Sequence, residues 1–172
     1  KATDVTGSVG RIKVAAKPIT FYDNWIPSSV ELAEDCQVKV KSGVVSARTG
    51  YRMFFHENGT IQSFTVSKSE PLDSSIGKIY PQEGSVMALH PNGMLSSVSP
   101  EDICMVTVAD VLYFTKACSP IAFRGDGRVL RFSAEAQDFT FGEFKFTLEN
   151  GSTEMFVYED GSVFFSTPGY VH

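Results

Sequence analysis

Apolar and polar residues alternate along this chain, and the alternation recurs at a fixed interval. An Asn-Gly or Asp-Gly dipeptide returns every 34 residues, as Asn58-Gly59, Asn92-Gly93, Asp126-Gly127 and Asp160-Gly161. Ahead of these dipeptides run two apolar columns: Ile19, Met53, Met87, Ile121 and Met155, then Phe21, Phe55, Leu89, Phe123 and Val157. Apolar residues that recur two positions apart are typical of a strand with one buried face. The pattern therefore predicts tandem β repeats.

The interval divides the chain into units of one repeat domain, residues 1–172. The complete units span 17–50, 51–84, 85–118 and 119–152, with a half unit at 1–16 and a partial unit at 153–172. The second half of each unit also alternates, as in Val38-Lys39-Val40, and no long segment has a helical period with caps. We therefore expect an all-β fold with three or four short strands per unit.

The dipeptides predict the turns. Apolar residues resume after each one, at Ile61, Leu95, Val129 and Val163. A two-residue type I′ hairpin loop needs positive φ at both positions, which Gly and Asn tolerate best. The first unit has Trp25 in place of the glycine and Pro27 in place of the apolar residue, so we expect a different turn there.

Two assemblies would bury the apolar faces of such units. The first is an open array, a twisted sheet or solenoid in which each unit contacts only its neighbours. The alternative is a closed five-unit, propeller-like ring with a composite unit made from the two termini. The 34-residue unit is short for a propeller blade, which favours the open array.

Composition excludes some classes of protein. The chain is 42% hydrophobic and 20% charged, which indicates a folded domain, and its net charge of −5 argues against a nucleic-acid binder. No apolar run reaches the length of a transmembrane helix. The chain starts at Lys1 without Met, so we expect that something upstream has been removed, and a lost signal peptide or lipoprotein leader would fit. The expected location is extracytoplasmic: periplasm, surface or secreted.

The cysteines predict little chemistry. Cys36 and Cys104 occupy the same column two units apart, too far for a disulfide in a stacked array. Cys104 with Cys118 is the one pair considered for a disulfide. The favoured interpretation is that all three cysteines are small, buried hydrophobic residues.

The unit resembles a known class of repeat. Phe55-His56-Glu57-Asn58-Gly59-Thr60-Ile61 and Val157-Tyr158-Glu159-Asp160-Gly161-Ser162-Val163 are similar to the turn segments of MORN-like β-hairpin repeats of bacterial surface and secreted proteins. The unit here is longer and lacks the regular Gly-rich second half. The resemblance implies a scaffold or interaction module and provides no catalytic residues.

One column offers a candidate binding surface. The members of this column form an outward stripe: Tyr22, His56, His90, Arg124 and Tyr158. The alternation of side chains along a strand directs this column away from the buried face. Such amphipathic, hydrogen-bonding side chains suit recognition, although an ordinary solvated strand face is the favoured interpretation. We find no catalytic arrangement and no motif for a cofactor, and the acidic residues hold no common register, so we expect no metal site.

These observations favour a non-enzymatic exported β-repeat scaffold, a protein-interaction or adhesion module with a protein or envelope component as partner. The alternative is a small-molecule or carbohydrate-binding module. The sequence leaves the oligomeric state open.

Overall fold

The structure is a computed structural model, which describes residues 3–7, 10–141, 143–148 and 153–166. The described residues form strands, turns and bridges, with no helix among them. All strand pairs are antiparallel, which confirms the predicted all-β repeat fold.

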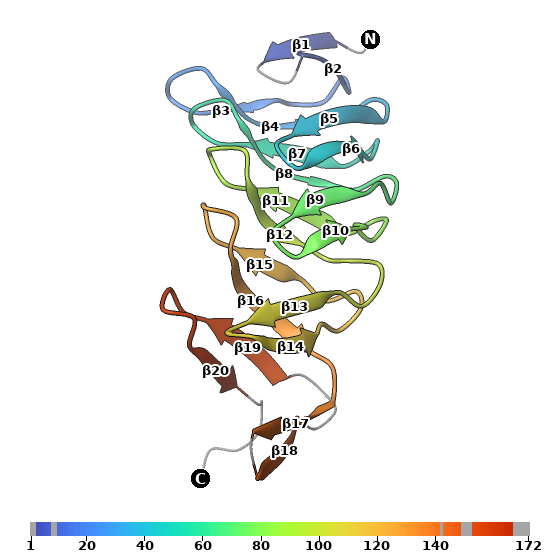
Figure 1. Cartoon of the computed structure of the whole chain (residues 1–172). Helices are drawn as coiled ribbons and strands as arrows, with labels where there is room; N and C mark the ends of the chain where they lie inside the picture. Colours follow the sequence, from blue (N-terminus) through green and yellow to red (C-terminus); the bar gives the residue numbers. More distant parts are fainter. Residues whose placement is uncertain (1–2, 8–9, 142, 149–152, 167–172) are drawn as a thin grey trace.

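Half of the strands build one antiparallel sheet of ten strands (Figure 1). It consists of five hairpins in chain order: β3 (Thr20–Phe21) and β4 (Pro27–Glu31), β7 (Arg52–Phe55) and β8 (Ile61–Thr65), β11 (Val86–Leu89) and β12 (Leu95–Val98), β15 (Ile121–Phe123) and β16 (Val129–Ala134), β19 (Thr153–Val157) and β20 (Val163–Ser166). The sheet is open, with β3 and β20 as its edges. The open array is therefore confirmed, and the alternative of a closed ring is wrong.

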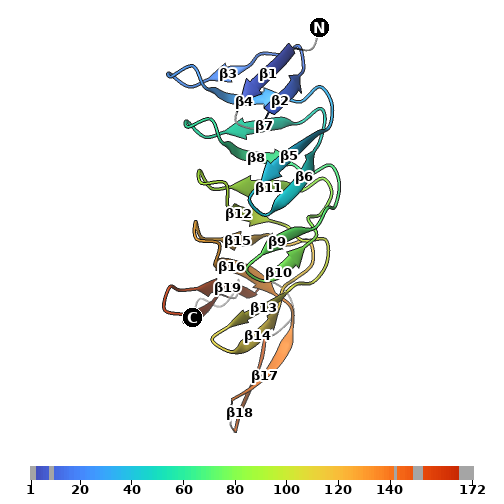
Figure 2. The same ribbon diagram turned by 45° about the horizontal axis from the view of Figure 1, so that its top comes forward.

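The other strands form five separate two-stranded hairpins, here called the cover hairpins. They are β1 (Thr3–Gly7) with β2 (Gly10–Val14), β5 (Cys36–Val40) with β6 (Gly43–Ala47), β9 (Leu72–Ser74) with β10 (Gly77–Ile79), β13 (Met105–Val108) with β14 (Val111–Phe114), and β17 (Gln137–Phe141) with β18 (Phe144–Leu148). They alternate with the sheet hairpins along the chain and lie along one side of the sheet (Figures 1 and 2). Each complete unit therefore contributes one sheet hairpin and one cover hairpin.

A repeated contact joins the two layers. Isolated antiparallel bridges link the end of a cover hairpin to the sheet chain, at Val14 with Leu32, Ala47 with Val66, Pro81 with Pro100, and Thr115 with Ala134. Their spacing follows the sequence period. The joint between the layers is thus the same in successive units.

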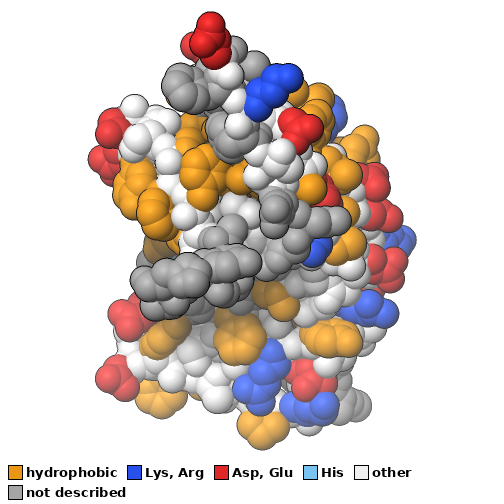
Figure 3. Space-filling view, turned by 90° about the horizontal axis from the view of Figure 1, so that it is seen from below, with side chains coloured by type: hydrophobic (Ala, Val, Ile, Leu, Met, Phe, Trp, Pro, Cys, Tyr) orange, Lys and Arg blue, Asp and Glu red, His pale blue; other side chains and the backbone are white. Residues whose placement is uncertain are grey.

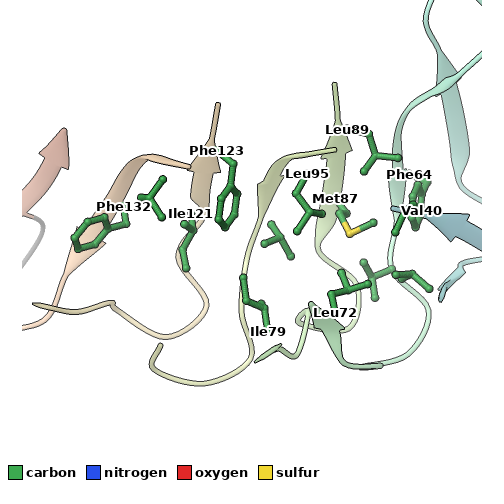
Figure 4. Packing of buried hydrophobic residues seen from close by; sticks show 14 of the residues in the cluster. Val40, Phe64, Leu72, Ile79, Met87, Leu89, Leu95, Ile121, Phe123 and Phe132 are labelled. Carbon is green, nitrogen blue, oxygen red and sulfur yellow. The ribbon is translucent and has the colours of Figure 1, made fainter. Parts of the chain in front are cut away.

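The hydrophobic core lies between the sheet and the cover hairpins (Figure 4). Met53, Met87, Ile121 and Met155 of the first predicted column are fully buried, and Leu72 and Ile79 of the β9–β10 cover hairpin belong to the same core cluster. The second column is also buried, except that Phe21 is 49% exposed. It lies in an edge strand, which has a sheet neighbour on one side only.

The sheet turns differ from the predicted type. In the turn of residues 56–60, the Gly59 N–H donates to the His56 carbonyl at 2.9 Å, and the His56 N–H donates to the Thr60 carbonyl at 2.8 Å. Gly59 has a φ of +79°, whereas Asn58 has no positive φ. This is a three-residue loop, a type I turn followed by a left-handed residue, so the prediction of a two-residue type I′ loop is wrong.

The first unit makes this same turn. The Trp25 N–H donates to the Tyr22 carbonyl at 3.0 Å, and Trp25 takes the left-handed conformation with a φ of +64°. The expectation of a different turn there is therefore wrong. The neighbouring units and the inter-unit contacts impose the turn at a cost of about 1–2 kcal/mol for a residue with a Cβ.

All three cysteines are free thiols, so the conceivable pair of Cys104 and Cys118 is not formed. Cys36 and Cys104 are partly buried, and burial raises the pKa of both thiols. Cys118 is exposed, against the expectation of a buried residue. It occupies the inter-unit turn position of Gly50 and Gly84 and shares their positive φ.

Candidate interaction surfaces

The predicted stripe forms a ladder of hydrogen bonds between units. The Tyr22 hydroxyl donates to the Phe55 carbonyl at 2.7 Å. His56 and His90 bond the carbonyls of Leu89 and Phe123 through Nε2, at 3.0 and 2.9 Å. Because a carbonyl only accepts, each ring must carry its proton on Nε2.

Arg124 continues this ladder. Its guanidinium donates to the Val157 carbonyl at 2.6 Å and lies 3.8 Å from the Glu159 carboxylate. Tyr158, the last member, is 53% exposed. The first four side chains are thus directed along the array and hold the turn of the next unit. The prediction that the stripe binds a partner stays a prediction.

A second ladder runs through the turn asparagines. Asn24, Asn58 and Asn92 donate from Nδ2 to carbonyls one unit ahead, those of Glu57, Pro91 and Gly125, at 3.0, 3.3 and 2.8 Å. The Oδ1 atom of each accepts the backbone N–H two residues later. One amide side chain therefore closes its own turn and also joins it to the next.

In the fourth unit, a different side chain makes the bond to the next turn. Asp126 keeps the acceptor role toward the Arg128 N–H at 3.0 Å but has no amide to donate. Instead Arg128 bonds the Asp126 carboxylate at 2.7 Å and donates to the Glu159 carbonyl at 3.5 Å, which is the equivalent acceptor. The N–H and guanidinium of Arg128 lower the pKa of Asp126.

A groove runs beside the row of sheet turns, and we call it the turn-side groove. Along the described part of the chain, three of its hollows have volumes of about 440, 300 and 250 Å³, and we call them the first, second and third hollows. Each is bounded by equivalent positions: a cover-hairpin segment (39–41, 73–75, 107–109), the pair after a sheet turn (60–61, 94–95, 128–129), and a turn glycine (Gly93, Gly127, Gly161). Lys41 lines the first and second hollows, and Ser75 and Arg128 line the second and third. The hollows are therefore adjacent.

The groove has an apolar floor and a charged rim. Ile61 and Leu89 line the first hollow, and Leu95 and Phe123 occupy the same columns in the second. These four side chains are buried members of the core. The floor of the turn-side groove is therefore formed by the edge of the core.

Charge is uneven along the rim. Lys39 and Lys41 are exposed beside the first hollow, and neither ammonium has a hydrogen-bond or ion-pair partner among the described residues. In contrast, Arg124 pairs with Glu159 and Arg128 with Asp126 beside the third hollow. The first hollow is therefore the end that attracts anions.

Exposed aromatic side chains mark both ends of the array. Trp25 is 81% exposed and lies 6.2 Å from the Phe21 ring, centroid to centroid. At the other end, Phe164 and Phe165 of β20 are exposed. Figure 3, which views the array from that end, shows hydrophobic side chains at the surface among acidic and basic ones.

The acidic residues serve as hydrogen-bond acceptors. Asp35 accepts from the Ser67 hydroxyl and from the Thr49 N–H, and these two bonds lower its pKa. Glu70 accepts from both the N–H and the hydroxyl of Ser46. Within the described part of the chain, no group of three or more His, Cys, Asp or Glu residues is placed to hold a metal ion.

Sequence reasoning found the columns but missed the groove. The signal was present: positions 59, 93, 127 and 161 are all glycine, and a residue without a side chain leaves space beside a turn. The stacking of the two layers decides which cover hairpin borders that space. The repeat period of the sequence does not contain this information.

A scan against protein-family models found no match, and searches of the curated proteins and of the solved structures found no match either. Among the described residues, no helix is long and apolar enough to cross a membrane.

Proposed function

We propose that this protein is a non-enzymatic β-repeat scaffold that binds an extended protein partner along the turn-side groove. The observation that carries the proposal is the threefold repetition of one hollow, with the same positions lining each copy. A compact ligand needs one pocket. A row of equivalent adjacent hollows suits a polymer that presents similar groups at a regular interval.

The size of the hollows supports this proposal. The hollows have volumes of about 440, 300 and 250 Å³, so the first lies in the lower half of the range for small-molecule sites and the other two lie at or below its lower end. One hollow alone offers little contact area. A chain that occupies several hollows gains affinity because each further contact is intramolecular.

The location proposed for this scaffold is the bacterial envelope or the exterior of the cell. The support is the resemblance of the turn segments to MORN-like repeats of surface and secreted proteins. Fractionation of source cells with an antibody against the domain tests the location, and confinement to the cytoplasm would refute it.

Selection from a random-peptide display library tests the function. Ser75→Tyr is the blocking variant. Ser75 lies in the wall shared by the second and third hollows, so an aromatic ring at this position fills the space of both hollows. Ser97→Tyr is the matched control: Ser97 pairs with Ala88 and Ala122 in the sheet, and alternation turns it away from the cover hairpins. Peptides that bind wild type and the control but not the blocking variant support the proposal. A library without such groove-dependent peptides contradicts it.

The second candidate function is a carbohydrate-binding module, favoured by the aromatic pair of Phe21 and Trp25. Amphipathic aromatic rings at a surface suit recognition of flat apolar faces such as those of sugars. Trp25 is the chain's single tryptophan, so its fluorescence reports ligands directly. A glycan array in which Trp25→Gly abolishes the signals of wild type would favour this candidate over the groove.

A further inference from the structure

The spacing of the hollows follows from the sheet. Each unit adds two neighbouring strands to the ten-stranded sheet, and neighbouring strands lie about 4.7–4.9 Å apart. Equivalent hollows therefore recur about every 9.4–9.8 Å along the array. This interval is the property that a bound polymer must match.

Two extended peptide conformations can be compared with this interval. A β-strand rises about 3.3 Å per residue and repeats a face every second residue, about 6.6 Å, which does not match one hollow per repeat. A polyproline II helix has three residues per turn and rises about 3.1 Å per residue, so it repeats a face about every 9.3 Å. Over the two intervals between the first and third hollows, its accumulated mismatch is about 1 Å or less.

We propose that the turn-side groove binds a proline-rich peptide in the polyproline II conformation, with an apolar side chain at every third residue. One such side chain enters each hollow and meets its apolar floor, as at Leu95 and Phe123 of the second hollow. This inference rests on the proposed function and specifies the class of partner.

Charge sets the direction of the peptide. Lys39 and Lys41 beside the first hollow have no partner among the described residues, whereas the cations at the third hollow are paired. Acidic residues at one end of the peptide complement the two lysines. The acidic end therefore lies at the first hollow, which is also the largest.

The polyproline II conformation also suits an open groove. Its backbone makes no internal hydrogen bonds and stays solvated, so it needs no sheet edge for pairing. Its preformed shape reduces the entropy lost on binding. The groove supplies donors rather than a strand edge, such as the Lys41 ammonium and the Ser75 hydroxyl on the shared walls.

Three synthetic peptides test the conformation and the register. The probe is fluorescein-labelled Asp-Asp-Leu-Pro-Pro-Leu-Pro-Pro-Leu. The register control contains one additional proline before the last leucine, and the strand control alternates leucine with threonine after the same two aspartates. Fluorescence anisotropy measures the Kd of each peptide. We expect the probe to bind at least about tenfold more tightly than either control, since each control leaves an apolar side chain outside its hollow.

Matched variants place the binding site. Lys39→Glu with Lys41→Glu should weaken probe binding about fivefold or more at low salt, and less at high salt, whereas Lys116→Glu with Lys145→Glu makes the same charge change away from the groove and should have a smaller effect. Ser75→Tyr should abolish binding, and Ser97→Tyr should not. Circular dichroism melts confirm that each variant is folded.

The outcomes separate the two proposals. Equal affinity for the probe and the register control, tighter binding of the strand control, or no binding of the probe would each overturn the polyproline inference. The proposed function would still stand if the display library yields groove-dependent peptides of another kind. Groove-dependent peptides with apolar residues at every third position and prolines between them would support both.

Discussion

The inter-unit asparagine ladder makes a sharp prediction about Asn92→Asp. The substitution preserves size and shape and keeps Oδ1, which accepts the Met94 N–H at 3.0 Å. It removes the Nδ2 donor, whose bond to the Gly125 carbonyl is 2.8 Å long. In its place a carboxylate oxygen faces a carbonyl oxygen. The change therefore isolates the bond between units from the closure of the turn.

The expected cost follows from this geometry. One hydrogen bond contributes about 0.5–1.5 kcal/mol net to stability. The oxygen–oxygen repulsion adds to the loss, but solvent screens it because both groups are exposed. We expect Asn92→Asp to lower the free energy of unfolding by about 1 kcal/mol, which lowers Tm by about 2–4 °C for a chain of this size. Asn92→Ala removes both bonds and should cost about twice as much.

The assay combines thermal melts with hydrogen exchange measured by mass spectrometry. Exchange is needed because units of a repeat array contact mainly their neighbours and open locally. Faster exchange should be confined to the turns of residues 90–94 and 124–128. An Asn92→Asp protein with the Tm and exchange of wild type would refute the inter-unit role of the amide. A loss equal to that of Asn92→Ala would show that the turn closure contributes nothing.

Three further predictions concern the turn, the acid limit and the core. Trp25→Gly should raise stability by up to about 1 kcal/mol in urea unfolding, because glycine adopts positive φ without strain but is more flexible when unfolded; a lower stability would contradict strain at this turn. The bonds from Ser67 and Thr49 lower the pKa of Asp35 below its ordinary value of 3.8, so its stabilisation is complete above that pH and is lost as pH falls through the lower folded pKa. Ser67→Ala should reduce this acid-side loss in urea titrations between pH 2 and pH 5, a range of about one to two units around the ordinary carboxyl pKa, and an unchanged profile would refute the linkage. Phe132→Ala should cost about 3–5 kcal/mol because Phe132 is 1% exposed, and urea unfolding should show a cost well above that of any surface change.

Local sequence pattern was sufficient to predict the strands of the sheet. The columns that contain Met53 and Phe55 predicted both the buried face and the period, because alternation and turn residues act over a few neighbouring positions. Local pattern was insufficient for the turn type. Asn-Gly suits a two-residue type I′ loop and also the three-residue loop that forms, and the inter-unit bonds of Asn58 and His56 accompany the second.

Part of the candidate site was also within reach of the sequence. Tyr22, His56, His90 and Arg124 are equivalent and amphipathic, so alternation identified them as one column. Their partners are carbonyl groups 33 residues ahead, and backbone acceptors leave no mark in a sequence. The column was therefore visible, whereas its role in joining units was not.

The sequence by itself determined that this protein is a tandem array of β hairpins with one buried face, because that information lies in the order of neighbouring residues. The tertiary structure alone decided that hairpins alternate between a continuous sheet and a row of covers, and that a groove of repeated hollows remains between them. Those features depend on how one unit stacks on the next. Stacking is set by the shapes and hydrogen-bonding groups of residues far apart in the chain. The repeat period gives the number of units but not the positions of these residues relative to one another.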